Sequence, residues 1–179
     1  MKFSNFYILL LLFTLTGNVF SSIKNDAETS IKNIFGEEST LTFEKFKLQN
    51  ELKNSIEKEA KQKFFRDEVY LWKITKNDSS LGFAILDNVL GKAMPITFLI
   101  IFDKEAKILS SEIIKYREAY GGQVGNRNWN EQFIGRNAES SFTVGKDVDG
   151  ISGATISVNS VSKGIQKLCI LAKAIKEKP

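Results

Sequence analysis

The sequence predicts an α+β fold, in which an antiparallel sheet is flanked by helices and an amphipathic helix ends the chain. Two observations carry this prediction. Four runs rich in β-branched and aromatic residues follow one another between residues 69 and 116, with short turn-forming connections between them. Residues 156–176 instead place apolar side chains three or four positions apart, which is the spacing of one helix face. Because short connections join neighbouring strands, we expect the strands to pair antiparallel.

The first 22 residues have the features of a secretory signal peptide or an N-terminal anchor. Lys2 precedes an apolar run over residues 6–13, and small polar residues follow that run. The run is short for a membrane span, which needs about 20 residues, so cleavage is the favoured outcome. We expect residues 23–179 to form a single domain that is exported, either to the periplasm or to the outer face of the cytoplasmic membrane.

The elements before the strand series are predicted from caps and apolar spacing. Asp26 is expected to cap a short helix that ends at Gly36. Residues 40–48 fit either a strand or a loose helix, and the pattern does not separate the two. Residues 50–64 predict a helix, because their apolar side chains recur every four positions with charges between them.

The strand series itself is bounded by turn residues. The four expected strands are Val69–Thr75, Leu81–Leu90, Ala93–Phe102 and Ala106–Tyr116. A segment rich in glycine and asparagine follows, and then a short helix that carries Trp129 and Phe133 and closes at Gly135.

The final helix has the clearest periodicity in the chain. Its apolar stripe consists of Val158, Val161, Ile165, Leu168, Ala172 and Ile175. Its lysines are expected off that stripe, namely Lys163, Lys167, Lys173 and Lys176. Cys169 borders the stripe and is expected to be a small core residue.

Composition excludes several classes of chemistry within this chain of 179 residues. It has no histidine and one cysteine, so it cannot supply a histidine-based triad, a histidine-ligated metal, an iron–sulfur cluster or an internal disulfide. The hydrophobic content of 42% is ample for a folded core. The net charge of +4 comes from lysines scattered among glutamates, so nucleic acid is not an expected partner.

The segment from Asp149 to Thr155 is the strongest candidate for a binding site. Two glycines, two hydroxyl side chains and a carboxylate lead directly into the final helix. Unpaired backbone N–H groups and the positive end of the helix dipole make such a place receptive to anions. From composition alone, Ser152 or Thr155 would more simply be a helix cap after a glycine turn.

The run Asp149-x-x-Ser152-Gly153-Ala154-Thr155 resembles the covalent flavin-attachment motif of the FMN-binding domain family. That family includes the C subunit of sodium-translocating NADH:quinone reductases and the G subunit of Rnf complexes. The resemblance extends over a core of about residues 81–173. It implies that a flavin transferase moves FMN from FAD onto Thr155 through a phosphoester bond. Ser152, Gly153 and Ala154 would form the turn that holds the phosphate, and Asp149 would belong to the segment that the transferase reads.

The implied function is that of an extracytoplasmic electron-transfer protein that carries covalent FMN. A membrane redox donor or acceptor would be its partner, and the isoalloxazine ring rather than the protein would carry the electrons. Tyr116, Tyr120 and Trp129 are candidates for packing against that ring. Two alternatives stay open: a small flavin-dependent reductase that acts directly on a substrate, and a cofactor-free exported binding module. The sequence does not decide whether the protein is an enzyme.

Overall fold

The computed structural model describes residues 21–177 of the chain. The predicted signal peptide or anchor, apart from its last two residues, lies outside the described residues. Within residues 21–177, no helix combines the length and the apolar character that crossing a membrane requires.

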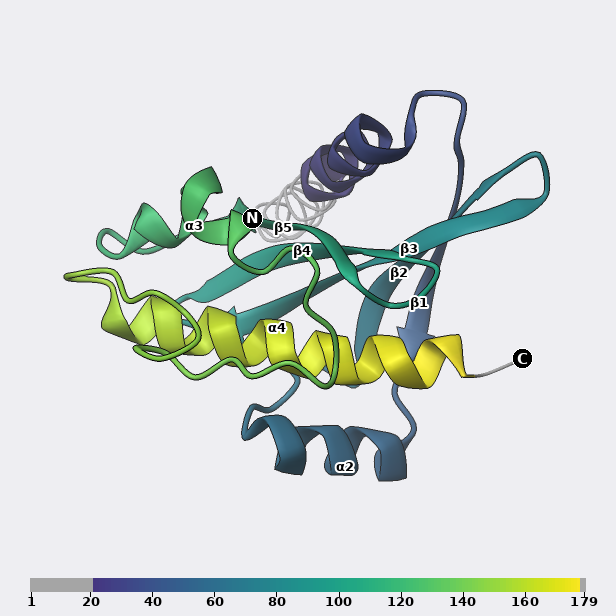
Figure 1. Ribbon diagram of the computed structural model, residues 1–179. Coiled ribbons are helices and arrows are strands. Elements are labelled where there is room, and N and C mark those ends of the chain that lie inside the picture. Colours follow the sequence, from purple (N-terminus) through teal and green to yellow (C-terminus); the bar gives the residue numbers. More distant parts are fainter. Residues whose placement is uncertain (1–20, 178–179) are drawn as a thin grey trace, which may run out of the picture.

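The centre of the molecule is a five-stranded sheet (Figure 1). Its strands are β1 (Thr40–Lys47), β2 (Glu68–Lys76), β3 (Ser79–Leu90), β4 (Pro95–Asp103) and β5 (Ile108–Lys115). They lie in the order in which they occur in the chain, and every neighbouring pair is antiparallel. The predicted α+β class and the antiparallel pairing are therefore confirmed, and the ambiguous segment 40–48 is an edge strand.

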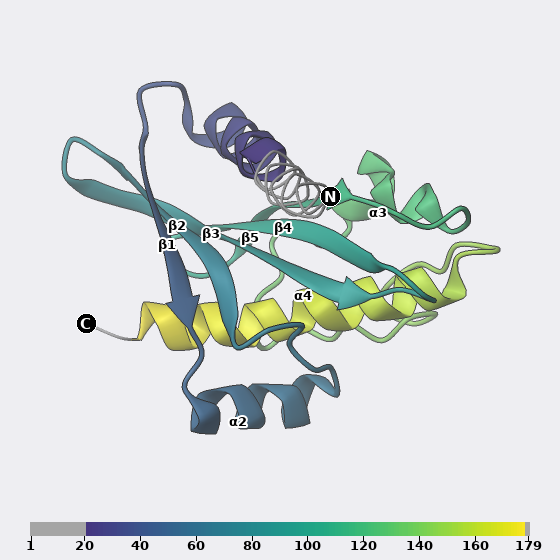
Figure 2. The ribbon, with the colours of Figure 1, turned by 180° about the vertical axis from the view of Figure 1, so that it is seen from behind.

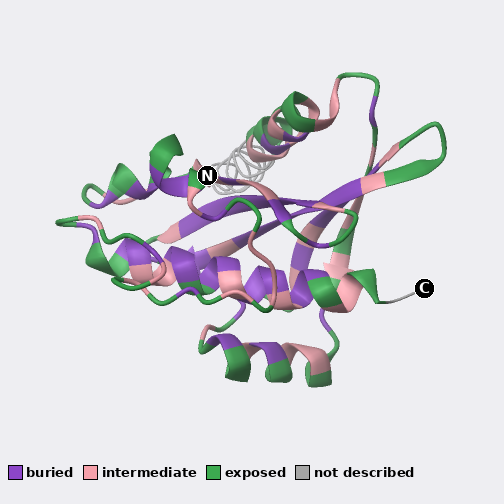
Figure 3. Ribbon diagram, viewed as in Figure 1, coloured by how far each residue is buried: buried purple, intermediate pink, exposed green. Residues whose placement is uncertain are grey.

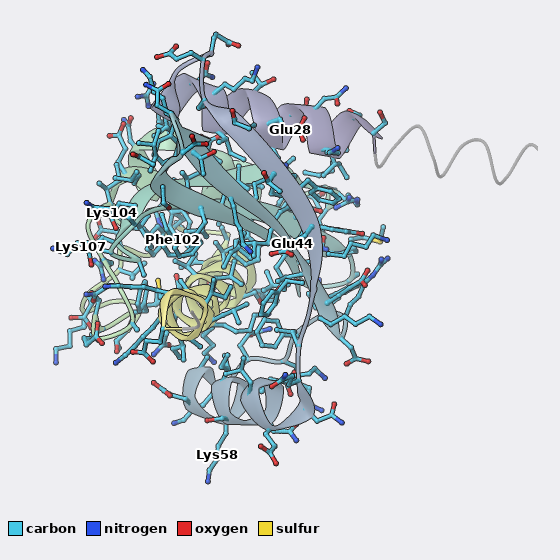
Figure 4. All side chains as sticks on the ribbon, turned by 90° about the vertical axis from the view of Figure 1, so that its right-hand side faces the viewer. Glu28, Glu44, Lys58, Phe102, Lys104 and Lys107 are labelled. Carbon is cyan, nitrogen blue, oxygen red and sulfur yellow. The ribbon has the colours of Figure 1, made fainter. Side chains whose placement is uncertain are left out.

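Helices cover both faces of this sheet. Gly164 of helix α4 (Thr155–Lys176) packs closely against Val89 and Phe98 on one face. On the other face, Trp72 of β2 donates a hydrogen bond from its indole Nε1 to Glu28 of the helix at residues 21–35, over 3.0 Å. Figure 4, which looks nearly along α4, shows α4 and the helix that carries Glu28 on opposite sides of the sheet.

Two-sided burial explains why the central strands have almost continuous apolar sequences. Seven consecutive residues of β4, from Ile96 to Phe102, are buried. In an antiparallel sheet with one face in water, every second of these side chains would be polar. Figure 3 shows buried residues along the strands of the sheet and along α4.

Helix α2 (Asn50–Ala60) joins β1 to β2 and packs against α4 rather than against the sheet (Figure 2). It ends earlier than the sequence predicts, because Lys61 adopts a left-handed conformation with φ of 51°. The expected cap at Asp26 is wrong, since residues 21–35 are all helical and Asp26 lies inside that helix. The predicted end at Gly36 is consistent with its φ of 91°.

The segment between β5 and α4 contains the short helices η1 (Gly122–Gly125) and α3 (Arg127–Glu131). The expected helix around Trp129 is therefore present, although Phe133 lies in the turn that follows it. Trp129 and Phe133 are both buried and meet edge to face, with ring centroids 5.1 Å apart.

Helix α4 confirms the predicted apolar stripe, and Cys169 is buried within it. One expectation about its lysines is wrong: Lys167 is fully buried and pairs with the buried Asp87, with 2.7 Å between Nζ and Oδ2. Lys163 is exposed, as expected. The spacing of residues along α4 does not reveal that Lys167 is buried, because the Asp87 carboxylate that pairs with its charge lies on β3.

Candidate functional site

A cleft of about 740 Å³ lies where α4 begins, at the yellow-green end of that helix in Figure 1. Three segments form its walls: the β3–β4 turn, the chain that leaves β5, and the start of α4. The lining residues are Lys92, Ala93, Met94, Arg117, Glu118, Ala119, Tyr120, Gly121, Gly153, Ala154, Thr155, Ile156 and Ser157. Gly153, Ala154 and Thr155 of the predicted motif are therefore brought into one cleft.

The turn before α4 depends on a glycine. Gly153 has a φ of 78°, in the left-handed region that side chains other than glycine's rarely adopt. Ala154 is the N-cap residue, and its N–H donates to the carbonyl of Ile151 over 3.0 Å. An alanine cap has no side-chain oxygen to accept from the first turn of the helix. The simple alternative, in which Ser152 or Thr155 caps α4, is not what the structure shows.

The first turn of α4 is consequently open to an anion. Within the described residues, the N–H groups of Thr155, Ile156 and Ser157 have no hydrogen-bond acceptor. The Thr155 side chain is exposed, and its hydroxyl makes no hydrogen bond to any described residue. Free N–H groups and the helix dipole both favour negative charge at this position.

The motif loop is held in place by α3 and the turn after it. Trp129 donates from Nε1 to the carbonyl oxygen of Asp149 over 2.8 Å. The N–H of Asp149 donates in turn to Oε1 of Gln132, also over 2.8 Å. Asp149, Ser152 and Trp129 do not line the cleft, so Trp129 contacts the backbone of the motif and not the cleft space. Asp149 and Ser152 are exposed on the loop that leads into α4.

Tyr116 ties the chain after β5 to the first turn of α4. Its hydroxyl donates to the carbonyl oxygen of Tyr120, so the 2.9 Å contact with Ser157 Oγ is a hydrogen bond donated by Ser157. Between them stands Gly121, with a φ of 85°. A Cβ on Gly121 would lie 2.7 Å from Tyr116 Oη and 2.8 Å from Ser157 Oγ, so glycine alone fits there.

Of the three predicted ring-packing residues, Tyr120 alone lines the cleft. Its side chain is 85% exposed, and Met94 and Ile156 on the other walls are 44% and 50% exposed. Exposed large apolar side chains around one cleft mark a binding surface. Met94 and Ile156 are not identified by the sequence, because a single apolar residue in a turn or at the start of a helix forms no periodic pattern that marks a cleft.

Glu118, on the chain that leaves β5, holds the β3–β4 turn in place. Its Oε1 accepts hydrogen bonds from the N–H groups of Ala93 (2.7 Å) and Met94 (3.0 Å), which closes the β3–β4 turn against the chain after β5. These N–H groups, Met94 first, hold the pKa of Glu118 below its usual range. Gly91 allows this approach, since a Cβ there would lie 2.6 Å from the carboxylate.

Arg117, the residue before it, is half-buried and lines the cleft on the chain that leaves β5. Its Nη1 donates to the carbonyl oxygen of Pro95 and to Oγ1 of Thr97, both over 2.9 Å. Arg117 and Glu118 directly follow Tyr116 in the sequence, yet nothing in their spacing indicates that Arg117 reaches β4 or that Glu118 reaches the β3–β4 turn.

Residues 91–169 match the model of the FMN-binding domain family. The match spans all three walls of the cleft and the whole motif from Asp149 to Thr155. No curated protein matches the chain.

Proposed function

We propose that this chain, whose residues 91–169 form a member of the FMN-binding domain family, is an electron-transfer protein that carries FMN covalently on Thr155. The family assignment supports FMN as the cofactor. The covalent bond to Thr155 and the location outside the cytoplasm go beyond the family assignment and are part of the proposal. The observation that carries the covalent bond is the exposed Thr155 hydroxyl, free of any hydrogen bond to the described residues, at an uncapped helix N-terminus inside the cleft.

The cleft suits FMN in size and in chemistry. Its volume falls within the roughly 300–1,000 Å³ of small-molecule sites. The free N–H groups of Thr155, Ile156 and Ser157 offer donors for the phosphate, and Gly153 and Ala154 leave room for its close approach. The exposed apolar side chains of Met94, Tyr120 and Ile156 offer a surface for an aromatic ring.

Attachment is a phosphoryl transfer that balances without a redox step. The Thr155 oxygen bonds to the FMN phosphorus of FAD, the pyrophosphate bond breaks, and AMP leaves while the hydroxyl proton passes to solvent. This chain supplies the nucleophile and a helix N-terminus that stabilises the negative phosphate, and it has no histidine to act as base. The resemblance to the FMN-binding domain family implies that a separate flavin transferase catalyses this step, and Asp149 on the exposed loop would belong to the surface that it reads.

When bound, FMN supplies the capacity to accept and release electrons. The tether keeps the flavin at a high effective concentration beside the cleft, so that it is not lost where free FMN is scarce. Tyr120 would pack on the ring, and Tyr116 would position Tyr120 through the hydrogen bond between them. Trp129 would act on the attachment loop through Asp149 and not on the ring.

The proposed location is the outer side of the cytoplasmic membrane, where a membrane-bound redox protein would donate or accept the electrons. The support for this location is the apolar run near the N-terminus, which has the features of an export signal. Fusing residues 1–22 to a reporter that is active only after export tests it, and a reporter that stays in the cytoplasm would contradict it.

Replacing the attachment residue tests the covalent bond. The chain is co-produced with a flavin transferase and denatured, and its mass is measured. We expect the wild type to gain the mass of FMN less one water and Thr155→Val to gain nothing, because valine has the shape of threonine without the oxygen. Thr42→Val, at an exposed position on β1, is the matched control and should be flavinylated like the wild type.

Covalent flavin on Thr155→Val would contradict the assignment of the residue. A wild type that releases its FMN on denaturation would contradict the covalent bond while leaving FMN binding intact. Turnover of a small electron acceptor by the isolated flavin-loaded protein would instead favour the reductase, and a wild type that binds no flavin at all would favour the cofactor-free binding module.

A further inference from the structure

Arg117 is a positive charge fixed in the wall of the cleft. Its Nη1 is held by the Pro95 carbonyl and by Thr97 Oγ1, and Thr97 in turn donates to Asn88 Oδ1 over 2.7 Å. Thr97 is 2% exposed, so this anchor is part of the core at the end of the sheet. An arginine stays charged at any physiological pH, and its remaining donors are presented in a rigid plane.

This charge has no carboxylate partner. Among residues 21–177, no carboxylate oxygen lies within ion-pair distance of the Arg117 guanidinium. The adjacent Glu118 instead accepts the N–H groups of Ala93 and Met94. A half-buried cation that is held rigidly and left unpaired in a cleft is arranged to meet an anion from outside the chain.

We propose that Arg117 binds the isoalloxazine ring of FMN at the edge that becomes negative on reduction, and thereby raises the reduction potential of the flavin. The proposal rests on the proposed function. Reduction is FMN + 2e⁻ + H⁺ → FMNH⁻, with the electrons supplied by the redox partner and the proton by solvent. A nearby cation stabilises the anionic reduced ring more than the neutral oxidised ring, so it favours reduction.

The structure favours the ring over the phosphate as the partner of Arg117. The phosphate has its own donors, the free N–H groups at the start of α4, and its attachment point is Thr155. Arg117 belongs to a different wall, and its anchors Pro95 and Thr97 are the first and third residues of β4. The exposed Met94 lies on the neighbouring β3–β4 turn, which Glu118 joins to the segment that carries Arg117.

The test compares reduction potentials of flavin-loaded variants. Arg117→Gln keeps donor groups for Pro95 and Thr97 but removes the charge. We expect it to bind FMN as the wild type does and to lose about tenfold in the preference for the reduced form, which is about 30 mV for a two-electron couple. Lys92→Gln removes the same charge from the same cleft at an exposed position and should shift the potential much less. Arg117→Lys keeps the charge and should restore most of the potential.

A second readout is the pH dependence of the potential. Without the cation, the anionic reduced ring takes up a second proton at a higher pH. Below that pH the reduction potential changes with pH twice as steeply. We expect this change of slope to occur at a higher pH in Arg117→Gln than in the wild type.

A flavin-loaded Arg117→Gln with an unchanged potential would overturn the proposal. A folded Arg117→Gln that no longer acquires FMN would also overturn it, in favour of a role at the phosphate. Failure of covalent attachment in the wild type is a separate result, since the potential is then measured on FMN bound without the ester.

Discussion

At the residue scale, Glu118 shows how one carboxylate shapes the cleft. It faces the N–H groups of Ala93 and Met94, which would otherwise be unpaired at the end of a hairpin. Charge-assisted bonds of this kind are stronger than neutral ones, and they lower the pKa of the carboxyl group. Ionised Glu118 therefore stabilises the folded protein and keeps the wall that carries Met94 in position.

This stabilisation should depend on pH in a defined direction. Because the folded-state pKa of Glu118 is lowered, its contribution is present above the unfolded-state pKa of about 4.3 and is lost as the pH falls through the folded-state pKa. We expect Glu118→Gln to lower the melting temperature at neutral pH and to approach the wild type on acidification between about pH 6 and about pH 3. Glu59→Gln, at an exposed position on α2, is the control. A difference that does not change with pH would contradict the role of the charge.

At the element scale, α4 connects the core to Thr155, the proposed attachment residue. It starts with Thr155 in the cleft and continues along the sheet, where Gly164 allows its backbone to approach closely. A Cβ on Gly164 would lie 2.6 Å from Val89 Cγ1 and 3.0 Å from Phe98 Cζ. The distance between α4 and the sheet is thus set by a residue without a side chain, and the position of Thr155 follows from it.

Gly164→Ala should therefore destabilise the protein, although alanine is the better helix former by about 1 kcal/mol. Overpacking a core contact costs about 1–3 kcal/mol, and here it exceeds the gain in helix propensity. The double variant Gly164→Ala/Val89→Ala, which removes the methyl groups nearest the new Cβ, should recover part of the loss. Chemical denaturation measures each free energy of unfolding. A single variant more stable than the wild type would show that α4 shifts without cost.

At the scale of the whole molecule, a buried ion pair joins three parts of the fold. Lys167 of α4 contacts Asp87 of β3, donates to the carbonyl of Lys63 over 3.1 Å, and lies 4.2 Å from the centre of the Phe64 ring. Lys63 and Phe64 belong to the connection from α2 to β2. Burial raises the pKa of Asp87, and the adjacent ammonium opposes that shift. The pair fixes how α2, α4 and the sheet fit together.

Breaking this pair on one side should cost far more than removing it. Lys167→Met leaves the Asp87 carboxylate buried without a partner, for which we expect a loss of about 3–5 kcal/mol in the free energy of unfolding. Asp87→Leu/Lys167→Met replaces both charges and should lie much closer to the wild type. Lys163→Met, one turn away and exposed, should change stability by less than about 0.5 kcal/mol. If Lys167→Met proves as mild as Lys163→Met, the pair does not contribute to the assembly of the fold.

The sequence by itself determined four of the five strands, the final helix and the motif proposed for flavin attachment, because each is encoded in local periodicity or in a contiguous run. Alternating and continuous apolar runs specify strands wherever the tertiary structure places them, and Asp149 to Thr155 can be recognised without knowing their neighbours. The absence of histidine and the single cysteine also exclude a histidine-ligated metal and an iron–sulfur cluster built by this chain alone.

Only the tertiary structure decided which residues meet at the cleft. Arg117 reaches Pro95 and Thr97, Glu118 reaches Ala93 and Met94, and Trp129 holds Asp149, each across about twenty positions of chain. It also decided that Lys167 is buried, because the cost of burying that charge is offset by a carboxylate 80 positions away (167 − 87). Such contacts depend on how separate elements pack, and the spacing of residues within one element carries no information about them.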